Sequence, residues 1–442
     1  MKKSPLAILA LTLFIDLLGF GLILPLLPVY IMHYGGKPWV GGALLATFSL
    51  AQFIFSPIWG GLSDRIGRRP LILMSLIGSA ISFIFFGFAP NLPVLFIARI
   101  FAGILSSASI PTAQAYIADV TTPDKRASGM AVLGASFGLG FAFGPVIGGY
   151  VSQHPAFGLS ALAMPAMVAA VLCLFNFVWA LFMLPESLKP EDRNREVSDR
   201  KGAFESATSI RRYLKDPQVG KQLTVFMVVS FAFTAVEASF SWLILLRFHD
   251  VLVQTSTAAW TLAHPGQLLT PKIAQELLEQ AQAHASSTVF ILVGITLLIT
   301  QIAVMSGLSQ KFGENRLVVF GTAVLVVSML GIAFAPTLLI LYLIAPLIAL
   351  GNGVMGPSLN ALITQSAGPQ ERGQLSGVQQ GMGSLARVIA PPLNNTLVSI
   401  NPAIPFLISS VLMSAAFLLS LRLKPLQQTE MDDAEGAVSM GH

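Results

Sequence analysis

The sequence predicts an all-α polytopic membrane protein with twelve transmembrane helices in two pseudo-symmetric halves of six. Of its 442 residues, 54% are hydrophobic and only 11% are charged, and the mean hydropathy is +0.74. Ordinary soluble domains carry about 25% charged residues, so a chain this apolar cannot cover a surface that faces water. The second observation is that long apolar stretches alternate with short charged clusters. The third is that this pattern repeats once along the chain.

The spans follow from splitting the apolar stretches at Gly, Pro and Asn breaks and at charged clusters, since a helix needs about 20 residues to cross a bilayer. In the first half the sequence predicts helices over Leu6–Tyr30, Val40–Gly61, Pro70–Ala89, Pro93–Ala118, Ser128–Val151 and Ala161–Leu184. In the second half it predicts them over Leu223–Leu246, Thr288–Leu308, Leu317–Ala335, Leu338–Thr364, Ser376–Ser399 and Ala403–Leu421.

Four segments are expected from these spans: an N-terminal half (1–184), a cytoplasmic linker (185–222), a C-terminal half (223–421) and a cytoplasmic tail (422–442). The C-terminal half contains an extracytoplasmic insertion at 248–287 that exceeds the repeat. A Thr-Pro pair within this insertion is typical of a helix start. It predicts a short helix that covers the outer mouth of the protein.

The distribution of basic residues predicts the orientation in the membrane. With the N-terminus in the cytoplasm, the cytoplasmic segments hold 21 of the 26 Lys and Arg residues, and the opposite side holds three, Lys37, Arg247 and Lys272. This excess is the positive-inside pattern, so we expect both termini in the cytoplasm and the protein in the inner membrane. The net charge of +5 therefore reflects topology, and nucleic acid is not an expected partner.

An internal repeat relates the two halves. Shifting the sequence by 246 residues aligns Gly61-Leu62-Ser63 with Gly307-Leu308-Ser309 and Phe88-Ala89-Pro90 with Phe334-Ala335-Pro336. The same shift aligns Gly67 with Gly313, Pro111 with Pro357, Pro123 with Pro369, Arg126 with Arg372, and Pro145 with Pro391. One register over four predicted helices indicates a duplicated six-helix unit. In transporters built from such repeats, the substrate binds between the repeats near the bilayer midplane. The alternative is a duplicated scaffold without a transport role.

A glycine-rich charged motif lies in the expected cytoplasmic turn between spans two and three. It reads Gly61-Leu62-Ser63-Asp64-Arg65-Ile66-Gly67-Arg68-Arg69-Pro70. The glycines allow a tight turn, and Asp64 can accept hydrogen bonds or cap a neighbouring helix. The motif resembles the signature loop of the major facilitator superfamily, which implies a cytoplasmic latch between the halves. The alternative is a basic loop that only obeys the positive-inside pattern.

A row of glycines marks span five. Gly140, Gly144 and Gly148 recur every four residues, with Pro145 and Gly149 beside them. Glycines at this spacing make a flat helix face for close packing, and a proline removes one backbone hydrogen bond. Taken alone the row indicates packing. Its Gly-Pro-x-x-Gly-Gly sequence resembles the antiporter motif of the superfamily, which implies export rather than uptake.

Other segments are similar to the drug:proton antiporter branch of the superfamily and to its tetracycline-efflux group. They are Asp16–Pro28 in span one, Gln52 in span two, Arg99 and Ala115–Asp119 in span four, and Leu184–Ser187 after span six. The tetracycline exporters carry a membrane-embedded acid on the third helix, where this chain has Ser82. Because this acid is absent, the resemblance to the tetracycline exporters does not extend to tetracycline as the expected substrate.

Ionisable residues inside spans are costly and usually functional. For Asp16 and Arg99, which reach similar depths, we expect a proton-coupling pair or, alternatively, a static ion pair between helices. Glu237 is expected to couple protons or bind a cationic substrate, against the alternative of a structural carboxyl. Arg387 is expected to attract an anionic group of the substrate or to bond a backbone carbonyl. Gln52 is expected to line the substrate cavity with these charged residues.

The predicted function is secondary active transport, in which inward proton flow drives export of a small amphipathic compound by alternating access. The expected partners are that small molecule, protons and the lipid bilayer, and we expect a monomer. No cofactor is expected, and His249, His264 and His284 make no metal-binding pattern. The alternatives are an exporter of an endogenous metabolite such as a siderophore, a proton-coupled importer, or an intramembrane enzyme, which would need a nucleophile–base or metal pair within the spans.

Overall fold

The protein is a bundle of membrane-spanning helices. The computed structural model describes residues 5–121, 126–154, 156–160, 162–188, 212–301, 308, 311–366 and 372–423. Within these ranges the regular structure is helical, without a strand. Nine helical segments of the described part are long and apolar enough to cross a membrane, and a tenth apolar helix, Ile404–Ser420, is shorter.

The helices follow the predicted order. The N-terminal half contains α1 (Pro5–Ile23), η1 (Leu24–Leu26), α2 (Leu27–His33), α3 (Pro38–Ile66), α4 (Arg68–Gly87), α5 (Leu92–Ser106), α6 (Ser109–Val120), α7 (Arg126–Gln153) and α8 (Ala163–Met183). The C-terminal half contains α10 (Val219–Arg247), α11 (His249–Ala263), α12 (Pro271–Ile299), α14 (Glu314–Phe334), α15 (Leu338–Gln365), α16 (Arg372–Ile400) and α17 (Ile404–Ser420). Counting α1 to α2 and α5 with α6 as one crossing each, and leaving out α11, these helices make the twelve predicted crossings.

Two predicted spans are broken rather than continuous. The first passes from α1 through the 3₁₀ turn η1 into α2, and a proline stands in the first turn of both η1 and α2. The fourth is divided between Ser106 and Ser109, and Pro111 lies in the first turn of α6. Proline lacks a backbone N–H and disrupts the preceding helical turn, so the breaks follow from the sequence.

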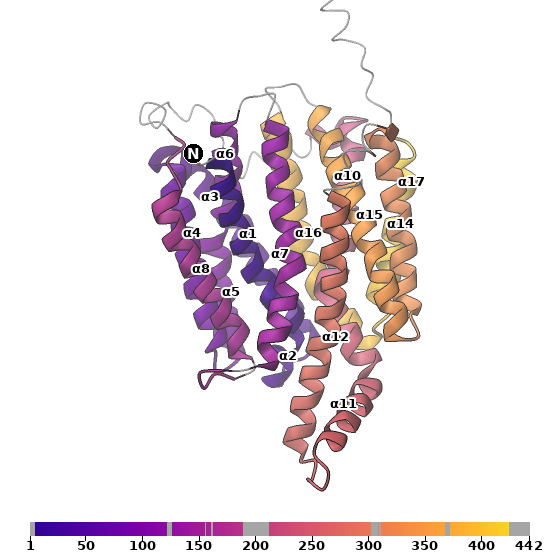
Figure 1. The fold of residues 1–442 in the computed structure, drawn as a ribbon. Coiled ribbons are helices and arrows are strands. Elements are labelled where there is room, and N and C mark those ends of the chain that lie inside the picture. Colours follow the sequence, from indigo (N-terminus) through magenta and orange to yellow (C-terminus); the bar gives the residue numbers. More distant parts are fainter. Residues whose placement is uncertain are drawn as a thin grey trace, which may run out of the picture.

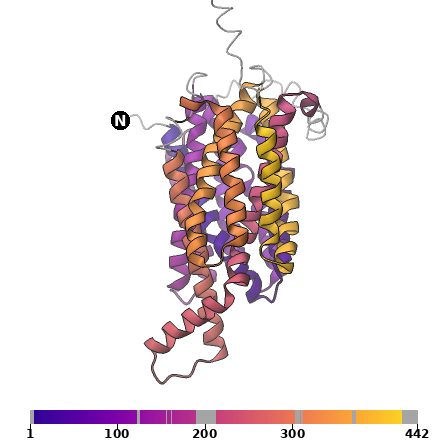
Figure 2. The ribbon, with the colours of Figure 1, turned by 90° about the vertical axis from the view of Figure 1, so that its right-hand side faces the viewer.

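The two halves stand side by side, with the helices of the N-terminal half on one side of the bundle and those of the C-terminal half on the other (Figure 1). Across the boundary α3 packs along α16, and α7 packs along α12. We call the end where α1 begins and α17 ends the termini face. The opposite end, from which α11 and the start of α12 project, is the hairpin face (Figures 1 and 2).

Helix caps confirm the 246-residue repeat at atomic detail. Asn91 caps the start of α5, where its side chain accepts a hydrogen bond from the backbone N–H of Val94. Thr337 caps α15 in the same way, accepting from the backbone N–H of Ile340. The two capping residues are 246 positions apart, and so are the two donors. Asn and Thr both serve as N-caps, so the repeat has kept the function of this position while changing the residue.

Glycine conformation and helix starts obey the same register. Gly67 precedes α4 with φ of 109°, and Gly313 precedes α14 with φ of 75°. Residues that carry a side chain rarely adopt a positive φ, which explains why both positions are glycine. The helices α4 and α14 begin at Arg68 and Glu314, again 246 residues apart. The two halves are therefore structural copies.

The insertion differs from its prediction. The Thr-Pro pair does start a helix, because Thr270 caps α12 and accepts a hydrogen bond from the backbone N–H of Ile273. That helix is not short, since it runs without a break into the eighth crossing and ends at Ile299. A second helix, α11, packs against it, and together they project beyond the bundle rather than lying across the mouth (Figure 1). The helix that contains the eighth crossing therefore begins at Pro271, ahead of the predicted start at Thr288.

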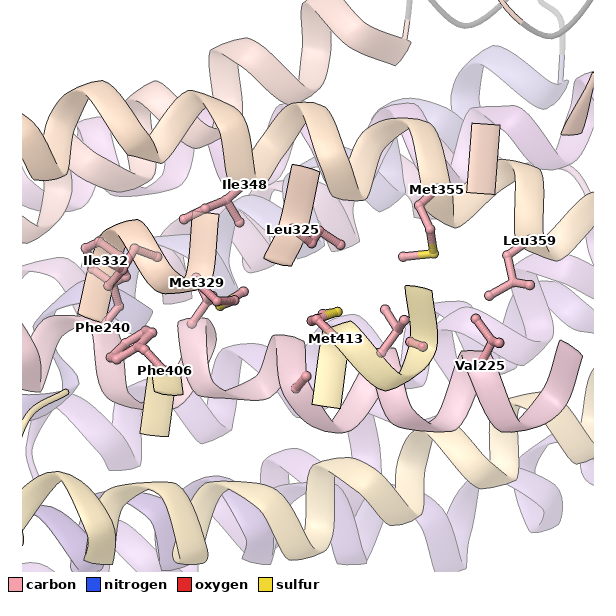
Figure 3. Packing of buried hydrophobic residues seen from close by; sticks show 14 of the residues in the cluster. Val225, Phe240, Leu325, Met329, Ile332, Ile348, Met355, Leu359, Phe406 and Met413 are labelled. Atoms are coloured by element: carbon pink, nitrogen blue, oxygen red, sulfur yellow. The ribbon is translucent and has the colours of Figure 1, made fainter. Parts of the chain in front are cut away.

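Three hydrophobic clusters hold the bundle together. One belongs entirely to the C-terminal half, and Figure 3 shows part of it, where Phe240, Met329 and Phe406 pack between helices α10, α14 and α17. A second, smaller cluster belongs entirely to the N-terminal half and includes Leu9 and Tyr116. The third combines residues of both halves. Its position decides which end of the molecule is closed.

Candidate functional site

The halves are sealed together at the hairpin face. The mixed cluster joins η1, α2 and the start of α3 to residues of the C-terminal half, namely Ala238, Trp242 and Leu245 of α10, Ala283 and Phe290 of α12, and Val398 of α16. Trp242 is only 2% exposed. The seal is therefore built from helix ends of both halves around one buried tryptophan.

Backbone contact between α3 and α16 completes this seal. A Cβ placed on Gly42 of α3 would lie 2.6 Å from the carbonyl carbon of Pro391 and 2.7 Å from the Cα of Pro392. Both distances are shorter than carbon atoms tolerate, so only glycine allows this approach. On α7, a Cβ on Gly149 would lie 2.7 Å from the Ser287 hydroxyl of α12.

Glycines of α3 and α16 nearer the termini face have free space beside them. A Cβ on Gly60 or Gly61 of α3, or on Gly377 of α16, would meet no atom within 4 Å. Midway, a Cβ on Gly381 would be 3.9 Å from the ring of Phe53. The structure is therefore closed at the hairpin face, while these glycines of α3 and α16 have free space beside them toward the termini face.

The sealed end buries polar atoms without protein partners. Within the described residues, each of five buried side chains at this end has one nitrogen or oxygen that makes no hydrogen bond: Gln282, Ser286, Ser287, Asn394 and Asn395. An unsatisfied buried polar group costs about 1–3 kcal/mol.

Asp16 lies inside the N-terminal half, where three helices meet. Its Oδ1 accepts a hydrogen bond from the Ser79 hydroxyl of α4 at 3.2 Å, and its Oδ2 accepts one from the Ser109 hydroxyl of α6 at 3.0 Å. Ser82, the position of the missing acid, is buried and donates its hydroxyl to the carbonyl of Gly78. Two hydroxyls, one from α4 and one from α6, thus orient the Asp16 carboxylate.

Arg99 lies apart from Asp16. Its guanidinium is 5.0 Å from the ring centre of Phe86 and 5.9 Å from that of Phe48, and the residue is 5% exposed. A cation above an aromatic face is attracted by the ring quadrupole. The ion pairs within the described residues do not include Asp16 or Arg99. The two residues share a half of the protein but do not form the pair that their similar depths suggested.

Glu237 and Arg387 line one cavity of about 120 Å³ in the C-terminal half. Glu237 comes from α10 and Arg387 from α16, and the two charges interact electrostatically. The remaining lining residues are Phe226, Val229, Ser230, Phe233 and Thr234 of α10 and Asn352, Met355, Gly356, Leu359 and Asn360 of α15. The α10 residues recur every three to four positions, which places them on one helix face. Gln52 of α3 is half-buried and does not line this cavity.

The signature loop forms a charge cluster within the N-terminal half. Arg68 pairs with Asp64 at 2.5 Å and with Asp119 of α6 at 3.2 Å. Glu186 accepts hydrogen bonds from the backbone N–H groups of Arg68 and Arg69 at the start of α4. A carboxylate at a helix N-terminus is stabilised by the unpaired N–H groups there. The ion pairs and hydrogen bonds named here join residues of the N-terminal half.

The remaining loop residues flank this cluster. Gly67 ends α3 with its positive φ and lets the chain turn directly into α4. Arg65 is exposed, and Arg69 is half-buried and donates a hydrogen bond to the carbonyl of Leu181 in α8. Gly61 faces open space. The loop therefore fixes α3, α4, α6 and the end of α8 to one another.

The glycine row of span five packs against α1. A Cβ on Gly144 would lie 2.7 Å from the backbone of Gly21, and one on Gly140 would lie 2.8 Å from the Leu17 side chain. A Cβ on Gly148 would also meet the backbone of Leu22, whereas Pro145 lies inside the unbroken α7. The row holds α1, which carries Asp16, against α7, which contacts the other half.

Sequence reasoning missed several residues of the site. Ser79 and Ser109 are ordinary serines in apolar spans, and only their packing around Asp16 distinguishes them. Asn352 and Asn360 are eight residues apart, which is one helix face, and that spacing was a usable signal. Among the described residues no group of three His, Cys, Asp or Glu side chains is arranged to hold a metal ion.

Comparison with known proteins agrees with this architecture. The sequence pattern of the Major Facilitator Superfamily matches residues 9–276 and 266–439. The chain is 30% identical over 395 residues to the tetracycline resistance protein, class C, of Escherichia coli, covering 88% of this chain and 89% of that protein. It is 27% identical over 424 residues to multidrug resistance protein 2 of Bacillus subtilis (strain 168), covering 93% of each.

Solved structures share the fold. The human organic anion transporter MFSD10 (TETRAN) matches with a TM-score of 0.68 and 24% identity, over 95% of this chain and 99% of that one. The nucleoside transporter NupG matches with a TM-score of 0.66 and 12% identity, over the same shares. The family match spans both halves, and the helices, repeat and seal described above fit a transporter rather than an enzyme. The chain is a multi-pass membrane protein and secondary active transporter that belongs to the Major Facilitator Superfamily.

Proposed function

We propose that the protein exports small amphipathic compounds, including drugs, in exchange for protons that enter the cell. The relatives named for tetracycline and multidrug resistance support efflux and a part in antibiotic resistance. The observation that carries proton coupling is the carboxylate of Asp16, held by Ser79 and Ser109 between α1, α4 and α6. A membrane-embedded carboxyl can exchange between protonated and ionised forms as access alternates between the two sides.

The proposed orientation places the termini face in the cytoplasm of the cell and the hairpin face outside. The excess of Lys and Arg in the segments of the termini face supports this assignment. The seal described above then lies on the outside, and we propose that this conformation admits substrate from the cytoplasm for export. The proposal also divides the chain into two halves, a cytoplasmic linker and a cytoplasmic tail, at residues 1–184, 223–421, 185–222 and 422–442 respectively. It places the protein in the inner membrane as a monomer.

The proposed cycle uses both halves. In the inward-open state the compound enters between α3 and α16 and binds near Glu237 and Arg387, while Asp16 is ionised. Opening of the seal at Gly42 and Trp242 then exposes the site to the outside, where a proton binds Asp16 and the compound leaves. Since Ser82 replaces the acid of the tetracycline exporters, we propose a substrate other than tetracycline.

Everted membrane vesicles test this function. Their interior corresponds to the outside of the cell, so acidifying it should drive accumulation of an exported dye, and collapsing the gradient should release it. Ethidium and a lipophilic weak acid would serve as first probes. Loss of the compound together with protons from such vesicles would instead identify a symporter.

A further inference from the structure

The cavity between α10, α15 and α16 holds two opposite charges that do not pair with each other. Glu237 and Arg387 both line it, yet the ion pairs within 4.0 Å recorded for the described residues include neither. The Arg387 guanidinium instead extends along its own helix, where its Nη2 is 3.8 Å from the position of a Cβ on Gly383. The charges are therefore held by different helices and face a shared space.

The size of the cavity limits what it takes. Pockets for whole drug-sized ligands measure about 300–1,000 Å³, whereas this cavity measures about 120 Å³. It fits a polar head group rather than an entire drug. Phe226 and Phe233 lie on the same face of α10 as Glu237 and offer an apolar surface to the rest of the compound.

We propose that this cavity binds a zwitterionic head group, in which Glu237 contacts an ammonium and Arg387 contacts a carboxylate on the same compound. Arg offers a planar fork of donors that matches a carboxylate, and Glu accepts the N–H bonds of an ammonium. Asn352 and Asn360 add neutral hydrogen-bonding groups. The substrate class is thus an amphipathic compound with an amino-acid-like head. This inference rests on the proposed export function, because it names the substrate of the same pathway.

Three probes that share the same apolar group but differ in the charge of the head group test the contributions of Glu237 and Arg387 separately. They are Nε-dansyl-lysine, which is zwitterionic, its methyl ester, which is cationic, and its Nα-acetyl derivative, which is anionic. Binding to the purified protein in detergent is measured by dansyl fluorescence, without a pH gradient. A hydrogen bond to a charged group contributes about 1.5–3 kcal/mol, so the zwitterion should bind roughly tenfold or more tightly than either single-charge probe.

Two variants should then give a crossed pattern. Glu237→Gln should weaken the zwitterion and the cation about tenfold and leave the anion unchanged, while Arg387→Gln should weaken the zwitterion and the anion and leave the cation unchanged. Each variant retains binding of one probe, which shows that it is folded. Glu276→Gln and Lys272→Gln, on the exposed part of the hairpin, remove the same charges away from the cavity and should change nothing.

Equal affinity of the wild-type protein for all three probes would overturn the zwitterion site. So would equal weakening of all three probes by both cavity variants, because the residues would then act only on the fold. The test is separate from the export assay. A crossed binding pattern without gradient-driven transport would contradict the proposed function and keep this site, and gradient-driven export with equal probe affinities would do the reverse.

Discussion

The Ser109 hydroxyl of α6 donates a hydrogen bond to the Asp16 carboxylate of α1 at 3.0 Å, 93 residues away in sequence. With the bond from Ser79 at 3.2 Å, it gives each carboxylate oxygen one donor. Hydrogen bonds to charged groups are worth about 1.5–3 kcal/mol. The two serines therefore stabilise the ionised form of Asp16 and fix its orientation at the junction of three helices.

Removing both donors should slow coupled transport. We expect Ser79→Ala combined with Ser109→Ala to reduce gradient-driven export by roughly tenfold, because the ionised carboxylate loses the hydrogen bonds that stabilise it. Initial rates in everted vesicles measure this. Ser75→Ala is the matched control, since the Ser75 hydroxyl is buried on the same helix but bonds the carbonyl of Ile72. Equal rates in the double variant and the control would exclude the serines from coupling.

Close packing of α7 on α1 should be intolerant of side chains. A leucine at position 144 has to displace the Gly21 backbone, which lies 2.7 Å from the added Cβ, and overpacking costs about 1–3 kcal/mol. Gly144→Leu should lose transport and lower the melting temperature of the purified protein. Gly377→Leu, at an exposed glycine with no atom near its added Cβ, should retain both. Wild-type transport by Gly144→Leu would contradict the close contact.

The seal at the hairpin face should depend on Gly42. A valine there cannot fit against Pro391, so Gly42→Val should shift the protein toward the state that is open at this face. A cysteine replacing the buried Ser239, in a background in which Cys173 is serine, reports this opening. We expect a membrane-impermeant maleimide to label it several-fold faster from the hairpin side.

The control for this labelling is Gly60→Val, on the same helix but facing open space. It should leave the labelling rate unchanged. Slow labelling in both variants would show that the contact between Gly42 and Pro391 does not hold the seal closed.

The exposed part of the hairpin should be dispensable for insertion. Residues 261–272 are exposed, whereas Leu252 and Gln282 are buried against the bundle. Replacing residues 254–276 with a short Gly/Ser bridge keeps both buried ends, so the variant should reach the membrane in normal amounts. Quantifying the protein in the membrane fraction tests this, and loss of insertion would make the hairpin part of the core fold.

The sequence predicted the fold in considerable detail because each span is a local pattern. Apolar length gives the crossings, and matching blocks such as Phe88-Ala89-Pro90 and Phe334-Ala335-Pro336 give the register of the repeat. The breaks in spans one and four lie at prolines of the sequence, although both spans were predicted to be continuous helices. The helix α11 was missed because its fifteen residues are too few for a membrane span and include four threonines and serines.

The site was predicted less completely because depth along a helix does not give direction around it. Asp16 and Arg99 reach similar depths, yet one faces α4 and α6 and the other lies over Phe86. Which face of a helix meets which neighbour depends on the tertiary packing of several helices. The same reason explains why Glu237 and Arg387 were recognised singly, and only the structure places both in one cavity.

The most direct test of the account is gradient-driven transport by the Asp16→Asn variant. Asparagine keeps the size of the side chain and one of its two acceptor oxygens but cannot bind and release a proton. In everted vesicles with an acidic interior, the wild-type protein should accumulate substrate, and the variant should not. The variant should still exchange labelled for unlabelled substrate without a gradient, which shows that it is folded and binds. Accumulation by Asp16→Asn at the wild-type rate would contradict the central claim that Asp16 couples protons to export.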